Sequence, residues 1–317
     1  MTDTAVLDWL LDSDPTLRWQ VERDLAGAPE STWQNTRARI AAEGDGARLL
    51  SHQDPDGQWA GGAYFPAGFT GDEPGTQPWT ATTWTLTTLR EWGLDADALA
   101  GTAELLAANS RWEYDDLPYW DGEVDVCINA MTLANGAWLG ADVVKLAAWF
   151  PEHQLADGGW NCDWVEGSTR SSAHSTMNAV THLLAYERIT GDDSLRDARH
   201  RGEQYLLERR LRYRMSDGEQ LGPWTDRILY PYRWALTALR GIDYVTGAAL
   251  HDGIRPDPRI AEQVERVRAA RRPDGRWLQG HVYPGAVWFP LDVPVGEPSK
   301  WVTFLAQRAL NRWDAAA

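Results

Sequence analysis

Residues that could bind a metal ion gather in one stretch of this chain, from Glu123 to His174. Both cysteines of the protein, Cys127 and Cys162, lie in this stretch. Asp125 precedes the first cysteine by two residues, and His174 follows the second by twelve. Thiolate, imidazole and carboxylate groups are the usual zinc ligands in proteins. The stretch therefore predicts a zinc site made by Asp125, Cys127, Cys162 and His174.

Two other interpretations of the cysteines stay open: a pair of inert buried side chains, and a redox pair. The sequence shows no signal-peptide pattern and no apolar run long enough to span a membrane. We therefore expect a cytoplasmic protein without a membrane span. A permanent structural disulfide is not expected in that compartment.

Composition limits the classes of partner. The formal net charge of −16 argues against nucleic acid, because a polyphosphate requires a basic surface. An anionic substrate would have to be bound by a local group of arginines against this overall field. With 43% hydrophobic residues the chain can form a core of its own, and we expect residues 1–317 to be a single domain. Nothing in the sequence predicts an oligomeric state.

The spacing of apolar residues predicts an all-α fold. Leu17, Val21 and Leu25 recur at helical intervals, and the alternation typical of β-strands is nearly absent. Turn residues such as Gly140, Gly191 and Gly247 separate the helical segments. The later expected helices are 32–50, 79–92, 95–109, 124–139, 141–154, 172–190, 194–212, 228–246, 257–271 and 298–313.

An internal repeat indicates how these helices are organised. The pattern Asp-Gly-X-Trp occurs at 56–59, 157–160 and 274–277, and each copy follows a predicted helix. A looser copy, Ser216-Asp217-Gly218 with Trp224, falls between the last two. Successive full copies are 101 and 117 residues apart, which corresponds to two helical hairpins each. Hairpins of about 40–50 residues are typical of stacked helical arrays. About six of them would fill the chain and allow a closed ring.

The longer form of the repeat, Gln-X-X-Asp-Gly-X-Trp at 53–59 and 154–160, resembles the repeats of the squalene cyclase and protein prenyltransferase superfamily. This resemblance implies an α/α toroid, in which an outer ring of helices surrounds an inner ring. The inner helices would be 79–92, 124–139, 172–190, 228–246 and 298–313. Asp125 and Cys127 would then begin one inner helix and His174 the next, with Ser171 or Ser172 as an N-cap.

The order and spacing of Asp125, Cys127 and His174 are similar to the zinc site of the protein prenyltransferase β subunits. Cys162 is not part of that pattern, but it resembles the second cysteine of the Cys-Cys-His zinc site in lanthionine-forming cyclases. If only three of these residues bind the ion, an open coordination position remains for catalysis. With Cys162 added, the site would be closed and structural.

The resemblance implies a zinc-dependent enzyme that acts on a small hydrophobic molecule, such as an isoprenoid, in a Trp-rich central cavity. The metal would activate a thiol or water. Nineteen tryptophans in the chain are consistent with such walls and also with ordinary packing. Tyr119, Trp120 and Trp288 are the expected substrate-binding residues. His182, on the expected inner helix 172–190, is a candidate acid or base, and also a candidate for an ordinary core histidine.

Two other functions stay open. In a metal-free class II terpene cyclase, Asp125 would be the general acid that protonates an alkene or epoxide. In a non-catalytic toroid, the zinc would be structural and the ring would act as a binding protein. A carbohydrate-active α/α barrel is a weaker possibility, because no pair of cavity carboxylates can be placed from the sequence.

The sequence departs from the prenyltransferases in the residues that hold a diphosphate. No basic residue stands just before the expected zinc stretch, where that family has its cations. A prenyl diphosphate would have to use other cations, for example Arg227, Arg233 or Arg240. We interpret them as surface charges, or as partners of Asp226 and Asp243.

Overall fold

The computed structural model describes residues 3–71 and 77–316, and this part of the chain consists of helices and loops without a β-strand. The all-α prediction is confirmed. None of the described helices is long and apolar enough to cross a membrane. The helices are α1 (Thr4–Leu11), α2 (Pro15–Asp24), α3 (Glu30–Ala38), α4 (Gly44–Leu50), α5 (Thr82–Trp92), α6 (Thr102–Asn109), α7 (Val126–Leu139), α8 (Val144–Glu152), α9 (Ala173–Thr190), α10 (Arg196–Glu208), α11 (Ala238–Asp252), α12 (Ala261–Ala269) and α13 (Lys300–Ala316).

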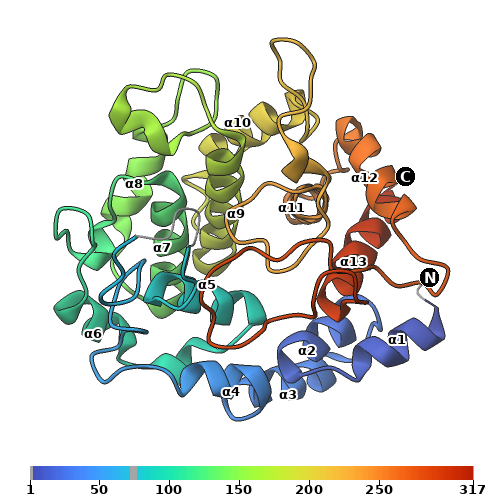
Figure 1. The fold of residues 1–317 in the computed structure, drawn as a ribbon, viewed down its shortest axis with the longest axis horizontal. Helices are drawn as coiled ribbons and strands as arrows, with labels where there is room; N and C mark the ends of the chain where they lie inside the picture. Colours follow the sequence, from blue (N-terminus) through green and yellow to red (C-terminus); the bar gives the residue numbers. More distant parts are fainter. Residues whose placement is uncertain (1–2, 72–76, 317) are drawn as a thin grey trace.

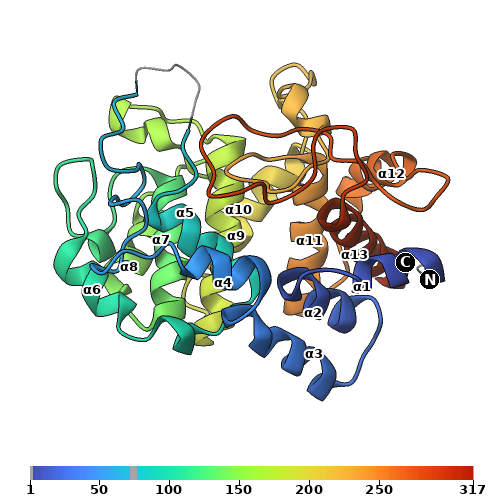
Figure 2. The ribbon, with the colours of Figure 1, turned by 60° about the horizontal axis from the view of Figure 1, so that its bottom comes forward.

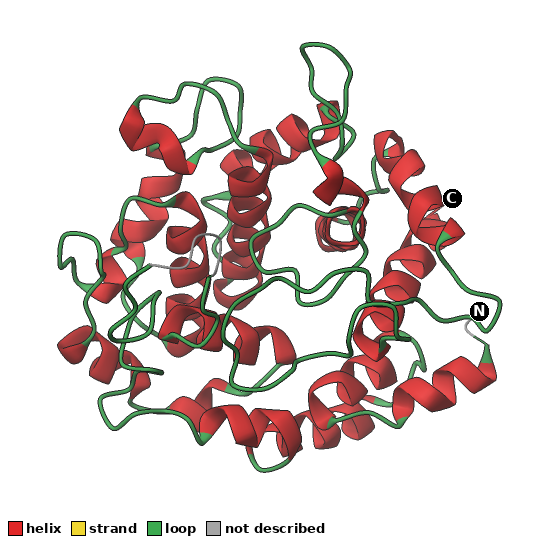
Figure 3. Cartoon of the chain, in the orientation of Figure 1, coloured by secondary structure: helices red, strands yellow, loops and turns green. Residues whose placement is uncertain are grey.

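Helices α5, α7, α9, α11 and α13 follow one another in space, each in contact with the next (Figure 1). Helix α13 then contacts α2, α2 contacts α4, and α4 contacts α5. A second set packs against these helices: α6 and α8 on α7, α10 on α9, and α12 on α11. A view from a second direction shows the N-terminal helices α1 and α2 beside α13 (Figure 2). Loops rather than helices cross the centre of the view in Figure 3.

Each full copy of the sequence repeat makes the same set of contacts. The three tryptophans are completely buried. Each indole N–H donates to the carbonyl ten residues earlier, in or beside the preceding helix: Trp59 to Leu49, Trp160 to Phe150 and Trp277 to Val267. Each tryptophan backbone N–H donates over 3.0 Å to a threonine hydroxyl of the following helix: Thr82, Thr176 and Thr303. The repeat therefore ties α4 to α5, α8 to α9 and α12 to α13.

The glycine of each repeat makes the turn between these contacts possible. Gly57, Gly158 and Gly275 have φ angles of 90°, 93° and 81°, a region that other residues rarely adopt. The looser copy does not make the same contacts. The indole N–H of Trp224 is buried and has no partner in the described part of the chain. This copy therefore does not tie two helices together as the full copies do.

Three expected helices were wrong in extent, and one of them, 95–109, is divided at Gly101 into a short 3₁₀ turn (Ala96–Leu99) and α6. The expected helix 228–246 begins ten residues later, as α11, because Pro231 cannot donate a backbone hydrogen bond and the segment before α11 is an aromatic loop. The expected helix 32–50 is divided into α3 and α4. The division lies at Gly44, whose φ of 61° is left-handed. In each of these places a turn residue interrupts the helix that the spacing of apolar residues predicts.

Replacing Thr176 by Val tests the contribution of the repeat contacts. The change leaves the buried backbone N–H of Trp160 without an acceptor, and we expect the free energy of unfolding to fall by about 1–3 kcal/mol. Thr181→Val is the matched control on the same helix. The Thr181 hydroxyl donates only to the carbonyl of Met177 one turn earlier. Equal midpoints for both variants in urea unfolding would contradict the proposed role of the contact.

Candidate functional site

The two cysteines meet at the N-terminal end of α7. Their Sγ atoms are 3.5 Å apart, with Cys127 in the first turn of α7 and Cys162 at the start of a short 3₁₀ turn before α9. Asp125 occupies the N-cap position of α7 without a capping hydrogen bond. The carboxylate of Glu123 accepts instead from the backbone N–H groups of Val124 and Asp125. Burial raises the pKa of Asp125, and its contact with Cys162 opposes that increase.

His174 makes its contacts with the segment before α11. It lies in the first turn of α9, and Ser172 is the N-cap, as predicted. Its Nδ1 accepts a hydrogen bond of 2.9 Å from the backbone N–H of Leu236, and its ring lies against Trp224 and Trp234. Burial lowers the pKa of His174 to about 4, so the ring is neutral with its proton on Nε2.

The residues fit a zinc ion only in part. Two thiolates bound to one tetrahedral zinc lie about 3.8 Å apart, close to the spacing of Cys127 and Cys162. The lone pair of His174 Nδ1 is already engaged. Within residues 3–71 and 77–316, no three of the four predicted ligands place their ligand atoms within 4.8 Å of one another. The zinc prediction stays a prediction, and no step below depends on a metal.

Two other groups of metal-ligand residue types are already occupied by an arginine. They are Glu187, His251 and Asp252, and His200, Glu203 and Asp252. The guanidinium of Arg199, which is completely buried, pairs with Glu187, Glu203 and Asp252 at 2.7–3.2 Å. These carboxylates therefore form an ion-pair network that joins α9, α10 and α11, and the guanidinium supplies the positive charge that a metal would bring.

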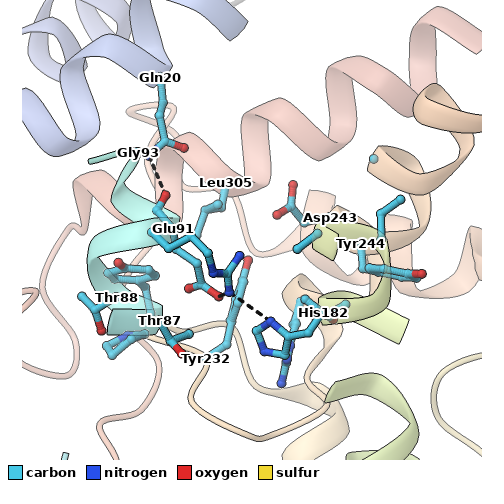
Figure 4. A pocket seen from close by; sticks show the side chains of 18 of the residues that line it. Gln20, Thr87, Thr88, Glu91, Gly93, His182, Tyr232, Asp243, Tyr244 and Leu305 are labelled. Carbon is cyan, nitrogen blue, oxygen red and sulfur yellow. Dashed lines mark hydrogen bonds and ion pairs between the residues drawn. The ribbon is translucent and has the colours of Figure 1, made fainter. Parts of the chain in front are cut away.

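A cavity with a volume of about 490 Å³ lies between α2, α5, α7, α9, α11 and α13. Figure 4 shows Glu91 of α5, His182 of α9 and Tyr232 of the loop before α11 turned toward the same space. Aromatic side chains form much of its wall: Trp84, Trp138, Tyr230, Tyr232 and Trp301. This volume lies within the range of about 300–1,000 Å³ that is usual for sites of small molecules.

The charge of the cavity wall is opposite to that of the whole protein. Eight arginines line the cavity, against the two carboxylates of Glu91 and Asp243: Arg23, Arg37, Arg90, Arg188, Arg233, Arg240, Arg308 and Arg312. Asp243 is already paired with Arg308 at 2.7 Å and with Arg312 at 3.4 Å. The cavity therefore concentrates positive charge inside an acidic chain.

Arg90 and His182 form a hydrogen-bonded pair on the cavity wall. Arg90 donates to Asn135 Oδ1 over 2.9 Å and to His182 Nδ1 over 3.1 Å. Burial, followed by the charges of Arg90 and Arg240, holds the pKa of His182 well below its usual range. His182 is therefore a neutral ring that carries its proton on Nε2, where it is available to a ligand as a hydrogen-bond donor.

Arg240 corrects an expectation from the sequence. It is 5% exposed, so its interpretation as a surface charge was wrong. It does not pair with Asp243, because it donates to the carbonyls of Arg233 and Ala235 and to Asn178 Oδ1. No carboxylate in the described part of the chain lies within 4.0 Å of its guanidinium, and burial lowers its pKa.

Arg233 also lines the cavity, where it is partly buried and has no carboxylate partner in the described part of the chain. It lies over the ring of Trp79, 4.6 Å from the centroid, and no ion pair is formed in residues 3–71 and 77–316. Burial lowers its pKa to about 10. The hydroxyl of Tyr232 and the indole N–H of Trp84, both on the cavity wall, are buried and have no partner in the same residues. The hydroxyl of Tyr232 and the indole N–H of Trp84 can therefore form hydrogen bonds with a ligand in this cavity.

The predicted site residues divide between the cavity and its surroundings. His182 lines the cavity, whereas Asp125, Cys127, Cys162 and His174 do not. Of the predicted substrate-binding residues, Tyr119 is buried against Thr83, Trp120 donates to the carbonyl of Ala103, and Trp288 stacks on His52. None of these three lines the cavity.

Arg233 and Arg240 were considered from the sequence as cations for a diphosphate but interpreted as surface charges, and the other six cavity arginines were missed, although the sequence contained a signal for Arg90 as well. Arg90 ends a run of threonine, leucine and tryptophan residues without another charge, and Arg233 stands in the aromatic segment Tyr-Pro-Tyr-Arg-Trp. Arg240 interrupts an apolar stretch from Ala235 to Ile242. A single arginine in such a run must be buried with its neighbours or lie beside a cavity.

Comparisons with known proteins leave the family open. No protein-family model matches the chain, and no curated protein matches it. A solved structure of a protein from Actinoplanes aligns over 95% of this chain and 90% of its own, with 15% sequence identity and a TM-score of 0.45. At that identity and score, the similarity assigns neither a fold family nor a function.

Replacing Arg233 by Met tests whether its charge is unpaired. Because burial of this guanidinium is not offset by a carboxylate, we expect the variant to raise the free energy of unfolding by about 1 kcal/mol. Arg199→Met is the contrasting variant. It removes the buried cation that three carboxylates share, although Glu187 keeps Arg196, and should lower the same quantity by about 3–5 kcal/mol. Similar losses for both variants in denaturant unfolding would contradict the assignment.

Proposed function

We propose that the chain is an α/α toroid of the squalene cyclase and protein prenyltransferase type, and that its central cavity binds a small hydrophobic molecule with an anionic head group. The toroid is supported by the succession of contacts from α5 through α13 and back through α2 and α4. It is also supported by the three sequence repeats, each of which ties one helix to the next.

The observation that carries the proposal is a set of arginines on the cavity wall, one buried and two partly buried, that lack a close carboxylate partner in the described part of the chain. Arg233 and Arg240 have none, and Arg90 has only the half-exposed Glu91 at 3.9 Å. Removing such a charge from water costs several kcal/mol unless an opposite charge is supplied. A bound anion would supply it, and the Tyr232 hydroxyl and the His182 Nε2–H would add hydrogen bonds.

The remaining walls of the cavity suit an apolar tail. Trp84, Trp138, Trp301 and Met131 present aromatic and thioether surface next to the arginines. Together these features favour an isoprenyl diphosphate or another molecule with an apolar chain and an anionic head group. The aromatic faces would also stabilise a positive charge that develops on the hydrocarbon.

The same residues can promote ionisation of an allylic diphosphate. The carbon–oxygen bond would break with its electron pair moving to the diphosphate. Arg90, Arg240 and the His182 Nε2–H would stabilise the negative charge that develops there. The allylic cation would form against the tryptophan rings, away from bulk water. The fate of that cation, transfer or cyclisation, is not specified by these residues.

The other candidate functions have less support from the geometry. Asp125 is outside the cavity, which disfavours its role as the general acid of a metal-free cyclase. A binding protein without catalysis uses the same cavity and the same arginines. It differs from the enzyme only in the absence of turnover, which product analysis after incubation with farnesyl diphosphate would reveal.

Calorimetric titration with farnesyl diphosphate, farnesol and inorganic diphosphate tests the proposal. We expect farnesyl diphosphate to bind more tightly than either of the others, because it satisfies both the arginines and the apolar walls. Arg233→Met should weaken its binding by about tenfold or more. Arg266→Met, on the exposed face of α12, is the control that should leave binding unchanged. Equal affinity for farnesol, or no loss in Arg233→Met, would overturn the proposal.

A further inference from the structure

The proposed function leaves the cysteine pair unused. Cys127 and Cys162 lie outside the cavity lining, and both are partly exposed. Their Sγ atoms are 3.5 Å apart although the residues are 35 positions apart in the sequence. The Ser175 hydroxyl lies 3.4 Å from the sulfur of Cys162, and the amide nitrogen of Asn178 lies 3.5 Å from the sulfur of Cys127.

We propose that Cys127 and Cys162 form a reversible dithiol–disulfide pair. A disulfide has a sulfur–sulfur distance of about 2.05 Å, so the two atoms must approach by about 1.5 Å. Cys127 is fixed in the first turn of α7, which packs along α9. Cys162 is on a short 3₁₀ turn in the loop between α8 and α9, and this turn can shift without disturbing a long helix. Metal binding would require ligands that are not assembled around the pair.

A low-molecular-weight disulfide such as oxidised glutathione is the oxidant in this reaction. The sulfur of one cysteine attacks one sulfur of the small disulfide and releases one small thiol, which leaves a mixed disulfide on the protein. The second cysteine then attacks the protein sulfur of that bond and releases the second small thiol. Each protein thiol gives its proton to one departing thiolate. The protein loses two hydrogens, and the small disulfide is reduced to two thiols.

Asn178 connects the pair to the cavity. Its amide nitrogen contacts Cys127 Sγ, and its amide oxygen accepts from Arg240 over 3.0 Å. Disulfide formation converts the Cys127 thiol into a disulfide sulfur, which is a different hydrogen-bond partner for the Asn178 amide, and so changes a contact of the amide that positions Arg240. This coupling rests on the proposed function. It predicts that the oxidised protein binds farnesyl diphosphate about threefold or more weakly than the reduced protein.

Equilibration of the full-length protein in glutathione redox buffers tests the pair. We expect the number of reactive thiols to fall from two to zero, with a mass loss of about 2 Da and a linked peptide containing both cysteines, all reversed by dithiothreitol. Cys162→Ser is the control. It cannot form the intramolecular bond and should carry only a mixed disulfide with glutathione on Cys127. Ser175→Ala should still form the disulfide.

Other outcomes separate the parts of the account. Two thiols that persist across the whole buffer range would overturn the pair. So would a reduced protein that holds one zinc per chain and loses it in Cys162→Ser. If the disulfide forms but the affinity for farnesyl diphosphate is the same in both states, the coupling through Asn178 is wrong. If neither state binds farnesyl diphosphate, the proposed function fails while the disulfide result stands.

Discussion

Positive charge held on the wall of the cavity without matching carboxylates is the constraint around which the rest of this structure can be understood. Burial lowers the pKa of Arg90, Arg233 and Arg240, because the charged form of each is less stable there than in water. Carbonyl oxygens, a side-chain amide and an aromatic face hold two of them in place. Such groups orient a guanidinium without neutralising it. The charge therefore remains available to a ligand.

Helices that line the cavity are joined to the helices before them by a local contact that recurs along the chain. A buried tryptophan joins the end of one helix to the start of the next through two hydrogen bonds, and this occurs three times along the chain. Three of the helices that line the cavity, α5, α9 and α13, are thereby fixed at one end. By contrast, the network around Arg199 fixes α9, α10 and α11 with charges that are paired. The charges of this network are all paired, whereas Arg233 and Arg240 line the cavity without a carboxylate partner in the described part of the chain.

The sequence predicted the helices and the repeat well, because both depend on local spacing. Periodicity located α7 and α9 to within two residues at each end, and the tryptophan repeats marked the helix junctions. The same periodicity gave the wrong start for α11. Pro231 and the aromatic residues around it form a loop there, which local spacing does not reveal. The candidate site was harder to predict, since a side chain's partners come from distant parts of the chain. The lone pair of His174 is used by Leu236, which is 62 residues away.

The clearest test of the account is a crystal structure of the protein with a non-hydrolysable analogue of farnesyl diphosphate. We predict that the diphosphate lies within hydrogen-bond distance of Arg233 and Arg240, with the hydrocarbon against Trp84 and Trp301. A head group bound at the outer surface, or an analogue placed in the cavity with its diphosphate away from both arginines, would contradict the claim that these charges await an anion.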